Sequence, residues 1–326
     1  MNAKSRELRK RLLRRYYKSA VLGWTRPRSL HWTKMVDSDG YWKWMKPDMG
    51  IRGQILQNPP LHLYQTVLRF RTDNPPRGTE TTGYFLGGPL FFDADVIEPH
   101  TPFSLWKIAG CSSLISSLED ILRDRGLYRI ARVSFSGLRG IHVFVDTCDD
   151  LCEPLTLSPY KQNREWKDFR LERIHISRSV GYWYPYWDWK VTADPWRIAR
   201  IPRSIHGGSA LQAMTFKPPY SMKRIRKQLR NATPFSLSKK VRIRITRPVP
   251  IFTFVDGESY GSFRKDWVTK LPIAVALHLV WLNFAKLRES GPRNSGEWFE
   301  HGWQMLFRGG VSEISMGQIP TGGVGG

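Results

Sequence analysis

Apolar and polar positions follow one another along this chain in patterns that predict strands and helices in turn. Apolar runs at residues 61–70 and 90–96 predict two strands, and leucine and isoleucine at helical spacing over residues 114–122 predict a helix that ends at Gly126. Residues 129–134 and 141–145 predict two more strands, joined by a short loop. This alternation of element types predicts an α/β fold.

Both ends of the chain depart from this alternation. Residues 4–18 hold eight basic residues and one acid around apolar positions at helical spacing, which predicts a basic amphipathic helix. Residues 267–310, rich in tryptophan and leucine, predict one helix from about Pro272 to Gly291 and a second over 297–307. The last ten residues include five glycines, as expected of a flexible tail in a trimmed chain or in the front part of a longer protein. We therefore expect a core at 1–255, a helical accessory domain at 256–310 and a flexible tail at 311–326.

The charge of the chain indicates a polyanionic partner. Lysine and arginine number 51 against 28 acidic residues, for a formal net charge of +23. The most apolar segment, residues 271–287, is interrupted by His278, Asn283 and Lys286, so it predicts a buried helix and no membrane anchor. There is no secretory signal pattern, and three cysteines imply no disulfide framework, so we expect a cytoplasmic protein.

Two acids stand within the apolar run at residues 90–96. Asp93 and Asp95 are two positions apart, so a strand would point both carboxylates from the same face. Such a pair suits two Mg²⁺ or Mn²⁺ ions, which take oxygen ligands and assist phosphoryl transfer. The structural alternative is that the strand ends at Asp93 and that Asp95 caps the following turn.

The loop after residue 134 has the composition of a phosphate-binding loop. It contains Gly137 and Gly140, which allow close approach of a ligand, and Ser136 and Arg139, which donate hydrogen bonds. His142 follows on the next predicted strand. An isolated histidine of this kind is more often a satisfied core or edge residue than a catalytic one.

A third group of polar residues lies between positions 188 and 208. Asp188 stands among aromatic residues and precedes arginines at 197, 200 and 203, and Ser204 and His206 follow in a turn. Arginine and histidine suit a triphosphate, and a third carboxylate suits a two-metal site. The alternative is that Asp188 pairs with one of the arginines at the surface.

Taken in order, these three motifs resemble those of the archaeo-eukaryotic primase superfamily, and most closely the catalytic small subunit of archaeal and eukaryotic DNA primase. The matching segments are Phe92-Asp93-Ala94-Asp95, Ser136-Gly137-Leu138-Arg139-Gly140-Ile141-His142, and Asp188 with the turn that ends at His206-Gly207; the Tyr16-Tyr17 pair also matches. The resemblance implies a mixed-sheet unit and an RNA-recognition-like unit with the active site between them. It implies two Mg²⁺ or Mn²⁺ ions on Asp93, Asp95 and Asp188, and a triphosphate bound by Ser136, Arg139, His142, Arg200, Ser204 and His206.

The function implied is synthesis of primers on a single-stranded DNA template from nucleoside triphosphates, with DNA polymerase activity. A helicase, an accessory subunit or a further domain is an expected partner. Two alternatives within the superfamily stay open, a primer-dependent repair or gap-filling polymerase and a terminal nucleotidyltransferase. A third alternative is a non-catalytic nucleic-acid-binding protein.

The chain departs from the family pattern at two places. The zinc knuckle expected after the acidic pair has only His100 and Cys111 as candidate ligands, so we predict no structural zinc; Cys148 and Cys152 come later. Gly208 stands where many relatives have a phosphate-contacting lysine, so either Lys217 or Arg203 replaces it or the triphosphate binds more weakly. Both departures suggest a divergent plasmid- or virus-borne enzyme.

The most basic stretch of the chain is residues 217–247, with eleven lysines and arginines and no acid. Residues 241–245 alternate apolar and basic, which predicts a half-buried strand with arginines exposed. We expect it to contact template phosphates, although such a run can also be a solvated face. The residues concerned are Arg224, Arg226, Lys227, Lys239, Lys240, Arg242 and Arg244.

Overall fold

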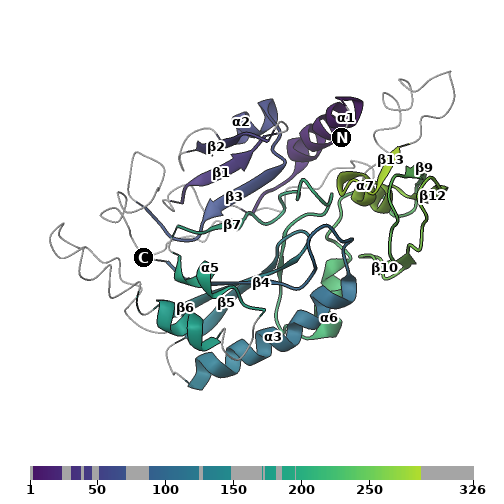
Figure 1. Ribbon diagram of the computed structural model, residues 1–326. Helices are drawn as coiled ribbons and strands as arrows, with labels where there is room; N and C mark the ends of the chain where they lie inside the picture. Colours follow the sequence, from purple (N-terminus) through teal and green to yellow (C-terminus); the bar gives the residue numbers. More distant parts are fainter. Residues whose placement is uncertain are drawn as a thin grey trace, which may run out of the picture.

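Two antiparallel sheets form the centre of the molecule in the computed structural model (Figure 1). The structure describes residues 3–23, 31–37, 40–45, 51–70, 88–124, 128–147, 171, 173–180, 186–194 and 196–287. The first sheet has the order β2-β1-β3-β7, with β1 (Thr33–Val36), β2 (Trp42–Met45), β3 (His62–Thr66) and β7 (Ile198–Arg200). The second sheet has the order β4-β6-β5-β8, with β4 (Leu90–Asp95), β5 (Tyr128–Phe135), β6 (Gly140–Thr147) and β8 (Met214–Phe216). The expected α/β class is confirmed.

Helices α1 (Ala3–Ser19) and α2 (Ile51–Gln57) cover the outer face of the first sheet (Figure 1). Leu13 of α1 and Ile55 of α2 are fully buried in one cluster with Met35 and Leu63 of the sheet. The amphipathic helix expected at residues 4–18 is therefore present, and its apolar side packs on the protein.

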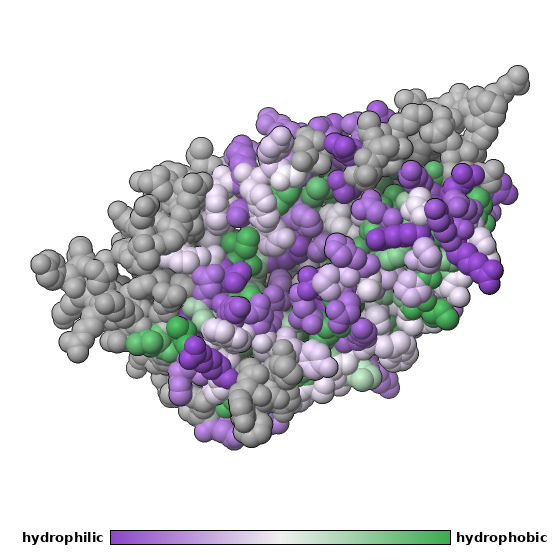
Figure 2. All heavy atoms as spheres, viewed as in Figure 1, coloured by the Kyte–Doolittle hydropathy of each residue, from purple (hydrophilic) through white to green (hydrophobic). Residues whose placement is uncertain are grey.

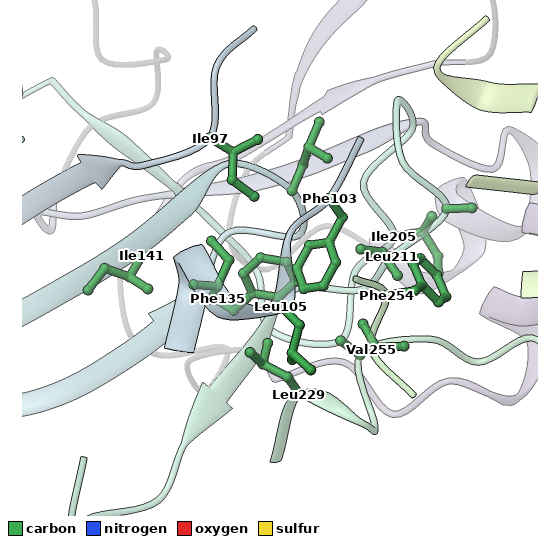
Figure 3. Packing of buried hydrophobic residues seen from close by; sticks show 14 of the residues in the cluster. Ile97, Phe103, Leu105, Phe135, Ile141, Ile205, Leu211, Leu229, Phe254 and Val255 are labelled. Carbon is green, nitrogen blue, oxygen red and sulfur yellow. The ribbon is translucent and has the colours of Figure 1, made fainter. Parts of the chain in front are cut away.

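Helices α3 (Leu105–Asp124) and α6 (Met222–Leu229) cover the outer face of the second sheet (Figure 1). Figure 3 shows the apolar layer beneath them, in which Phe103 meets Phe135 edge to face at 5.6 Å between ring centres. The order β4-α3-β5-β6 has the β-α-β-β arrangement that begins an RNA-recognition-like unit, as expected. The expected mixed sheet is not seen, because every strand pair in the described part of the chain is antiparallel.

A smaller apolar cluster lies where the two sheets meet. It contains Phe91 of β4 and Phe144 of β6, Phe70, which follows β3, and Ala199 of β7. Helix α5 (Trp189–Ala193) packs beside it against β4. Polar side chains of the inner faces, among them Asp93, His142 and Arg200, form the candidate site.

A third sheet follows the core and differs from the expected helical domain. Its order is β12-β9-β13, with β9 (Lys240–Ile245), β12 (Val268–Pro272) and β13 (Ala285–Leu287); β10 (Phe252–Thr253) and β11 (Ser259–Tyr260) form a separate hairpin. Helix α7 (Ile273–Trp281) starts directly after Pro272, as predicted, but ends ten residues before Gly291. Strand β9 lies before the expected boundary at 255/256 and β12 lies after it, and the two strands pair with each other. The division of the chain into domains stays a prediction.

Two further predictions at the C-terminal end lie outside the described residues, namely the helix at 297–307 and the tail at 311–326. Within the described ranges, no helix combines the length and the apolar character that crossing a bilayer requires.

Candidate active site between the two sheets

The acidic pair lies on the inner face of the second sheet. Asp93 and Asp95 occupy alternate positions of β4, and the intervening positions, Phe92 and Ala94, are buried on the opposite face. Asp93 is opposite His142 on β6, and Asp95 is opposite Gly140. A side chain at position 140 would collide with the carbonyl oxygen of Ala94, so glycine is required for the two strands to meet here.

Asp188 is held beside this pair through the main chain. Trp187 is buried against Phe92, and the amide of Asp188 donates to the carbonyl oxygen of Asp93 at 2.9 Å. The carboxylate of Asp188 accepts from the amide of Lys190 at 3.0 Å and so caps α5. The structure thus places Asp188 within electrostatic range of Asp93 and Asp95, as a helix cap, and among the described residues no arginine forms an ion pair with it.

The charges of these acids are only partly balanced. Burial, with Asp95 and Asp188 nearby, raises the pKa of Asp93 to about 7. Its Oδ1 is buried without a hydrogen-bond partner in the described part of the molecule, and His142 Nε2 lies 3.7 Å away. The pKa of Asp95 is also raised by burial, although its carboxylate forms a close ion pair with Arg139.

These features bear on whether the acids could hold a metal ion. Among the described residues, no three acidic, histidine or cysteine side chains are close enough to ligate one ion as they stand. The buried, unpartnered oxygen of Asp93 nevertheless suits a hard divalent cation, whose charge would also favour ionisation of Asp93.

The loop between β5 and β6 is a tight hairpin, as its glycines predict. Ser136 and Gly140 close it, since the Ser136 amide donates to the Gly140 carbonyl oxygen at 3.0 Å and Ser136 Oγ accepts from the Gly140 amide at 3.2 Å. Gly137 has φ of 99°, which favours glycine. Its carbonyl oxygen accepts from the hydroxyl of Ser209 at 2.7 Å, so the hairpin is tied to the turn that follows β7.

Arg200 is a buried cation on the inner face of the first sheet. Only 7% of its surface is exposed. One terminal guanidinium nitrogen donates to His62 Nδ1 at 2.9 Å and the other donates to the hydroxyl of Tyr64 at 2.8 Å. Both partners are uncharged groups of β3, so these hydrogen bonds orient the guanidinium without neutralising it.

Three histidines around this arginine are held neutral. Burial, with Arg200 nearby, lowers the pKa of His62 and of His142 to about 3, and lowers that of His206 well below its ordinary value. We call these four residues together with Tyr64 the Arg200 cluster. It carries a buried positive charge that interacts electrostatically with Asp93 of the second sheet, and a phosphate would be a suitable counter-ion.

The turn after β7 carries two predicted site residues, His206 and Ser204, whose side chains lie in different surroundings. His206 Nδ1 accepts from the Gly208 amide at 3.1 Å, so a neutral His206 carries its proton on Nε2 and can donate it to a ligand. Ser204 is fully buried, and its hydroxyl donates to the carbonyl oxygen of Ile201 at 2.6 Å. Its only hydroxyl proton is thus used within the turn, and the structure does not bring Ser204 to the site.

His62 and Tyr64 belong to the site and were missed by the sequence analysis. Their signal is a His-x-Tyr alternation within a predicted strand, the same spacing of two that marked the acidic pair. The possible substitutes for the family lysine lie elsewhere. Arg203 directs a guanidinium nitrogen toward the Val21 carbonyl oxygen at 3.5 Å, and Lys217 lies beyond β8.

His100 and Cys111, the two candidate ligands considered for a zinc knuckle, lie in different surroundings. His100 is exposed in a turn, and Cys111 is buried within α3. Cys148 and Cys152 lie outside the described residues.

The basic stretch 217–247 separates into two surfaces. Arg224, Arg226 and Lys227 lie on α6, on the outer side of the second sheet. Lys240, Arg242 and Arg244 are exposed on β9, with Lys239 just before it, so the predicted alternation is confirmed. In Figure 2, long hydrophilic side chains project from the region over β9 and β12, apart from α6.

The middle of the face in Figure 2 is hydrophilic over the space between the two sheets. The structure places Asp93, Asp95 and His142 on the second sheet, and Arg200, His62 and Tyr64 on the first.

Comparison with known proteins gives a distant sequence similarity. The chain is 26% identical over 204 residues to the DNA primase small subunit PriS of Sulfolobus acidocaldarius and 27% identical over 212 residues to that of Sulfurisphaera tokodaii, over 50% and 51% of this chain. The matches cover 61% and 63% of these relatives, so the chain spans less than two thirds of their length. No protein-family model matches. A solved structure, the polymerase domain of Mycobacterium tuberculosis ligase D in complex with DNA, aligns over 59% of this chain and 69% of that one, with 17% identity and a TM-score of 0.35. The similarity to the primase small subunit expected from the motifs is confirmed over half of the chain.

Proposed function

We propose that this chain, a distant relative of the DNA primase small subunit, is a nucleotidyltransferase that synthesises primers on single-stranded DNA and has DNA polymerase activity. The observation that carries the proposal is the opposition of two unbalanced charges. Asp93 is a partly buried acid on one sheet with one fully buried oxygen, and Arg200 is a buried cation on the other sheet. A nucleoside triphosphate with divalent cations would satisfy both.

The Arg200 cluster would bind the triphosphate. Arg200 offers a guanidinium already oriented by His62 and Tyr64, and the neutral ring of His206 offers an N–H donor. Ser136 would add its hydroxyl, which accepts from Gly140 and keeps its own proton free to donate. Because these donors are fixed by the fold before the ligand arrives, little reorganisation is needed when charge develops during the reaction.

Asp93, Asp95 and Asp188 would hold Mg²⁺ or Mn²⁺, which when bound polarises the phosphoryl group and favours deprotonation of the attacking hydroxyl. Arg139 forms an ion pair with Asp95, so this ion pair would have to break before Asp95 could bind a cation. A triphosphate offers Arg139 a stronger anionic partner, and Asp95 would then be free to bind a cation. We therefore expect triphosphate and metal to bind more tightly together than either does alone.

The exposed residues of β9 would contact the template. Arg242 is opposite Lys270, and Arg244 is opposite Lys286, so like charges face each other across the third sheet. Such pairs are destabilising unless an anion lies between them. Template phosphates would supply that anion, and binding should weaken steeply with salt. Because the relatives are named small subunits, we also expect a partner subunit.

The test supplies single-stranded template, Mn²⁺ or Mg²⁺ and labelled nucleotides, with and without a primer. We expect short products without a primer, and none from Asp93→Ala/Asp95→Ala. Extension only of an added primer with template indicates the gap-filling polymerase, and extension without template indicates the terminal transferase. If the wild type binds DNA but incorporates no nucleotide under any condition, the catalytic proposal is wrong and the non-catalytic binding protein remains.

A further inference from the structure

A row of side chains crosses the whole inner face of the first sheet. Trp44 of β2 pairs with Lys34 of β1, Lys34 pairs with Tyr64 of β3, and Tyr64 pairs with Arg200 of β7. Paired residues in neighbouring antiparallel strands project from the same face. The row therefore runs from the edge of the sheet to the buried guanidinium of the Arg200 cluster.

Trp42 lies two residues before Trp44 on the edge strand β2, beside this row, and is exposed. Its indole stacks on Tyr64 with 5.8 Å between ring centres and 25° between ring planes. Lys34 Nζ lies 4.1 Å from the centre of the same indole. Even so, 54% of Trp42 is open to solvent, and the neighbouring Tyr41 is 74% exposed. A large ring that is fixed by two neighbours yet left open is suited to receive a planar ligand.

We propose that Trp42, Tyr64 and Lys34 form a base-stacking platform for single-stranded DNA, which leads the strand toward the Arg200 cluster. The proposal rests on the proposed function of the space between the sheets. Unpaired bases stack on aromatic rings whatever their sequence, and a cation beside the ring attracts the backbone. We refer to these three residues as the stacking platform.

A single strand fits this surface better than a duplex or a free nucleotide. Duplex bases are stacked on one another and present no free face, whereas a single strand does. A free nucleotide would be held by its phosphates at Arg200. Trp42 is separated from that site by Tyr64, whose ring lies 4.5 Å from the Arg200 guanidinium. A polymer can reach both places at once.

The experiment measures binding of a fluorescently labelled single-stranded oligodeoxynucleotide of about 16 nucleotides by anisotropy, without metal and without nucleoside triphosphate. Trp42→Leu, which keeps an apolar side chain but removes the ring, is expected to weaken binding about 5-fold or more. Trp42→Phe, which keeps a ring, is expected to stay within about 2-fold of the wild type.

Trp106→Leu is the matched control. Trp106 is 48% exposed and has the Arg226 guanidinium 5.0 Å from its ring centre, but it lies on α3, on the outer side of the second sheet. We expect no change in binding from this variant. Should Trp42→Leu fail to fold, Lys34→Gln replaces it, with an expected loss of affinity and a shallower dependence on salt.

The outcomes separate this proposal from the proposed function. Equal binding by wild type and Trp42→Leu, or equal losses in Trp42→Leu and Trp106→Leu, would overturn the platform even if the enzyme is active. Loss of binding in Trp42→Leu alone supports the platform even if no nucleotide is incorporated. Trp42→Leu should still bind a nucleoside triphosphate as the wild type does, because the Arg200 cluster is unchanged.

Discussion

Among the site residues that the structure describes, Asp93 carries a charge that its surroundings compensate poorly. Asp95 forms an ion pair with Arg139, whereas Asp93 has a buried oxygen without a hydrogen-bond partner in the described structure and a pKa raised to about 7. Because the folded-state pKa lies above the unfolded value, ionisation of Asp93 lowers the stability of the fold as pH rises through about 7.

Asp93→Asn should therefore stabilise the protein and remove its activity. Without divalent cations at pH 8, we expect the free energy of unfolding to rise by about 1–3 kcal/mol, with a smaller gain at pH 5. Urea unfolding at both pH values measures this effect. Asp120→Asn, at an exposed acid on α3, is the control and should change little. A variant at position 93 that is less stable at pH 8 would contradict the account of the buried charge.

Gly208 and Gly207 give a paired test of the turn after β7, residues 204–208, which we call the phosphate turn because it would bind the triphosphate. A side chain at Gly208 would meet only the ring of His206, at 3.2 Å, whereas one at Gly207 would lie 2.7 Å from the backbone and side chain of Leu61. We expect Gly208→Lys to fold and to bind nucleoside triphosphate about 3- to 10-fold more tightly, through one added charge-assisted hydrogen bond.

The control for that prediction is Gly207→Ala, which should destabilise the protein without a gain in affinity. Calorimetric titration with a nucleoside triphosphate measures both variants. Unchanged or weaker binding by a folded Gly208→Lys would show that the phosphates do not lie beside this turn.

Among the site residues, the sequence predicted those whose side-chain direction is set by local structure. Strand alternation fixes the direction of Asp93 and Asp95, and the short hairpin loop 136–139 fixes Arg139 relative to His142. His62 was missed because its role depends on contact with β7, which is more than a hundred residues away. Ser204 was misplaced because a buried turn claims its hydroxyl.

Among the elements, helix α1 positions the phosphate turn from outside the first sheet. The hydroxyl of Tyr16 donates to the carbonyl oxygen of Arg203 at 2.6 Å, and that of Tyr17 accepts from the amide of Ile205 at 3.2 Å. Arg9 of the same helix donates to the Gly207 carbonyl oxygen at 3.4 Å. These bonds give the Tyr-Tyr pair a structural role in the turn.

Tyr17→Phe would leave the buried amide of Ile205 without its partner. We expect a loss of about 1–3 kcal/mol in the free energy of unfolding, and weaker triphosphate binding because the turn carries His206. Tyr41→Phe, at a tyrosine that is 74% exposed, is the control. If Tyr17→Phe and Tyr41→Phe unfold at the same urea concentration, α1 does not hold the turn.

Elements with strong local patterns were predicted well, including β4, β9 and α1. The C-terminal region was not, because β12 and β13 are short and depend on pairing with β9. Their residues alone resemble the margins of the apolar helix α7 between them.

Several histidines, inside the site and outside it, are buried in the neutral state, and their burial affects the stability of the whole molecule. His278 is fully buried and bridges Ser209 and Phe103, with Nδ1 2.7 Å from the Ser209 carbonyl oxygen and Nε2 accepting from the Phe103 amide at 3.0 Å. Burial lowers the pKa of His278 and of His31 to about 4, and that of His62 to about 3.

The protein should therefore lose stability in mild acid. These histidines take up protons in the unfolded chain below about pH 6.5 but not in the fold, so stability falls between about pH 6.5 and 4. His278 alone should account for about 3 kcal/mol at pH 4. Urea unfolding from pH 7 to 4.5, in an Asp93→Asn background that removes the opposing effect of Asp93, measures this slope.

His278→Gln should flatten the slope, and exposed His100→Asn should leave it unchanged. A stability that is constant from pH 7 to 4.5 would contradict the neutral, buried state of these histidines.

The facing of the two sheets could not be predicted from the sequence, because the contacts between them join residues far apart in the chain. Phe91 and Phe144 meet Phe70 and Ala199 in a cluster that no local pattern marks. The site between the sheets follows from that contact, so motif order indicated which residues take part but not how they oppose one another.

The most direct test of the central claim is a crystal structure of the protein with Mn²⁺ and a non-hydrolysable nucleoside triphosphate, with manganese located by anomalous scattering. The account predicts manganese at Asp93, Asp95 and Asp188, phosphates against Arg200 and His206, and Arg139 moved from Asp95 to the triphosphate. Manganese and nucleotide bound elsewhere, with Arg139 still paired to Asp95, would contradict it.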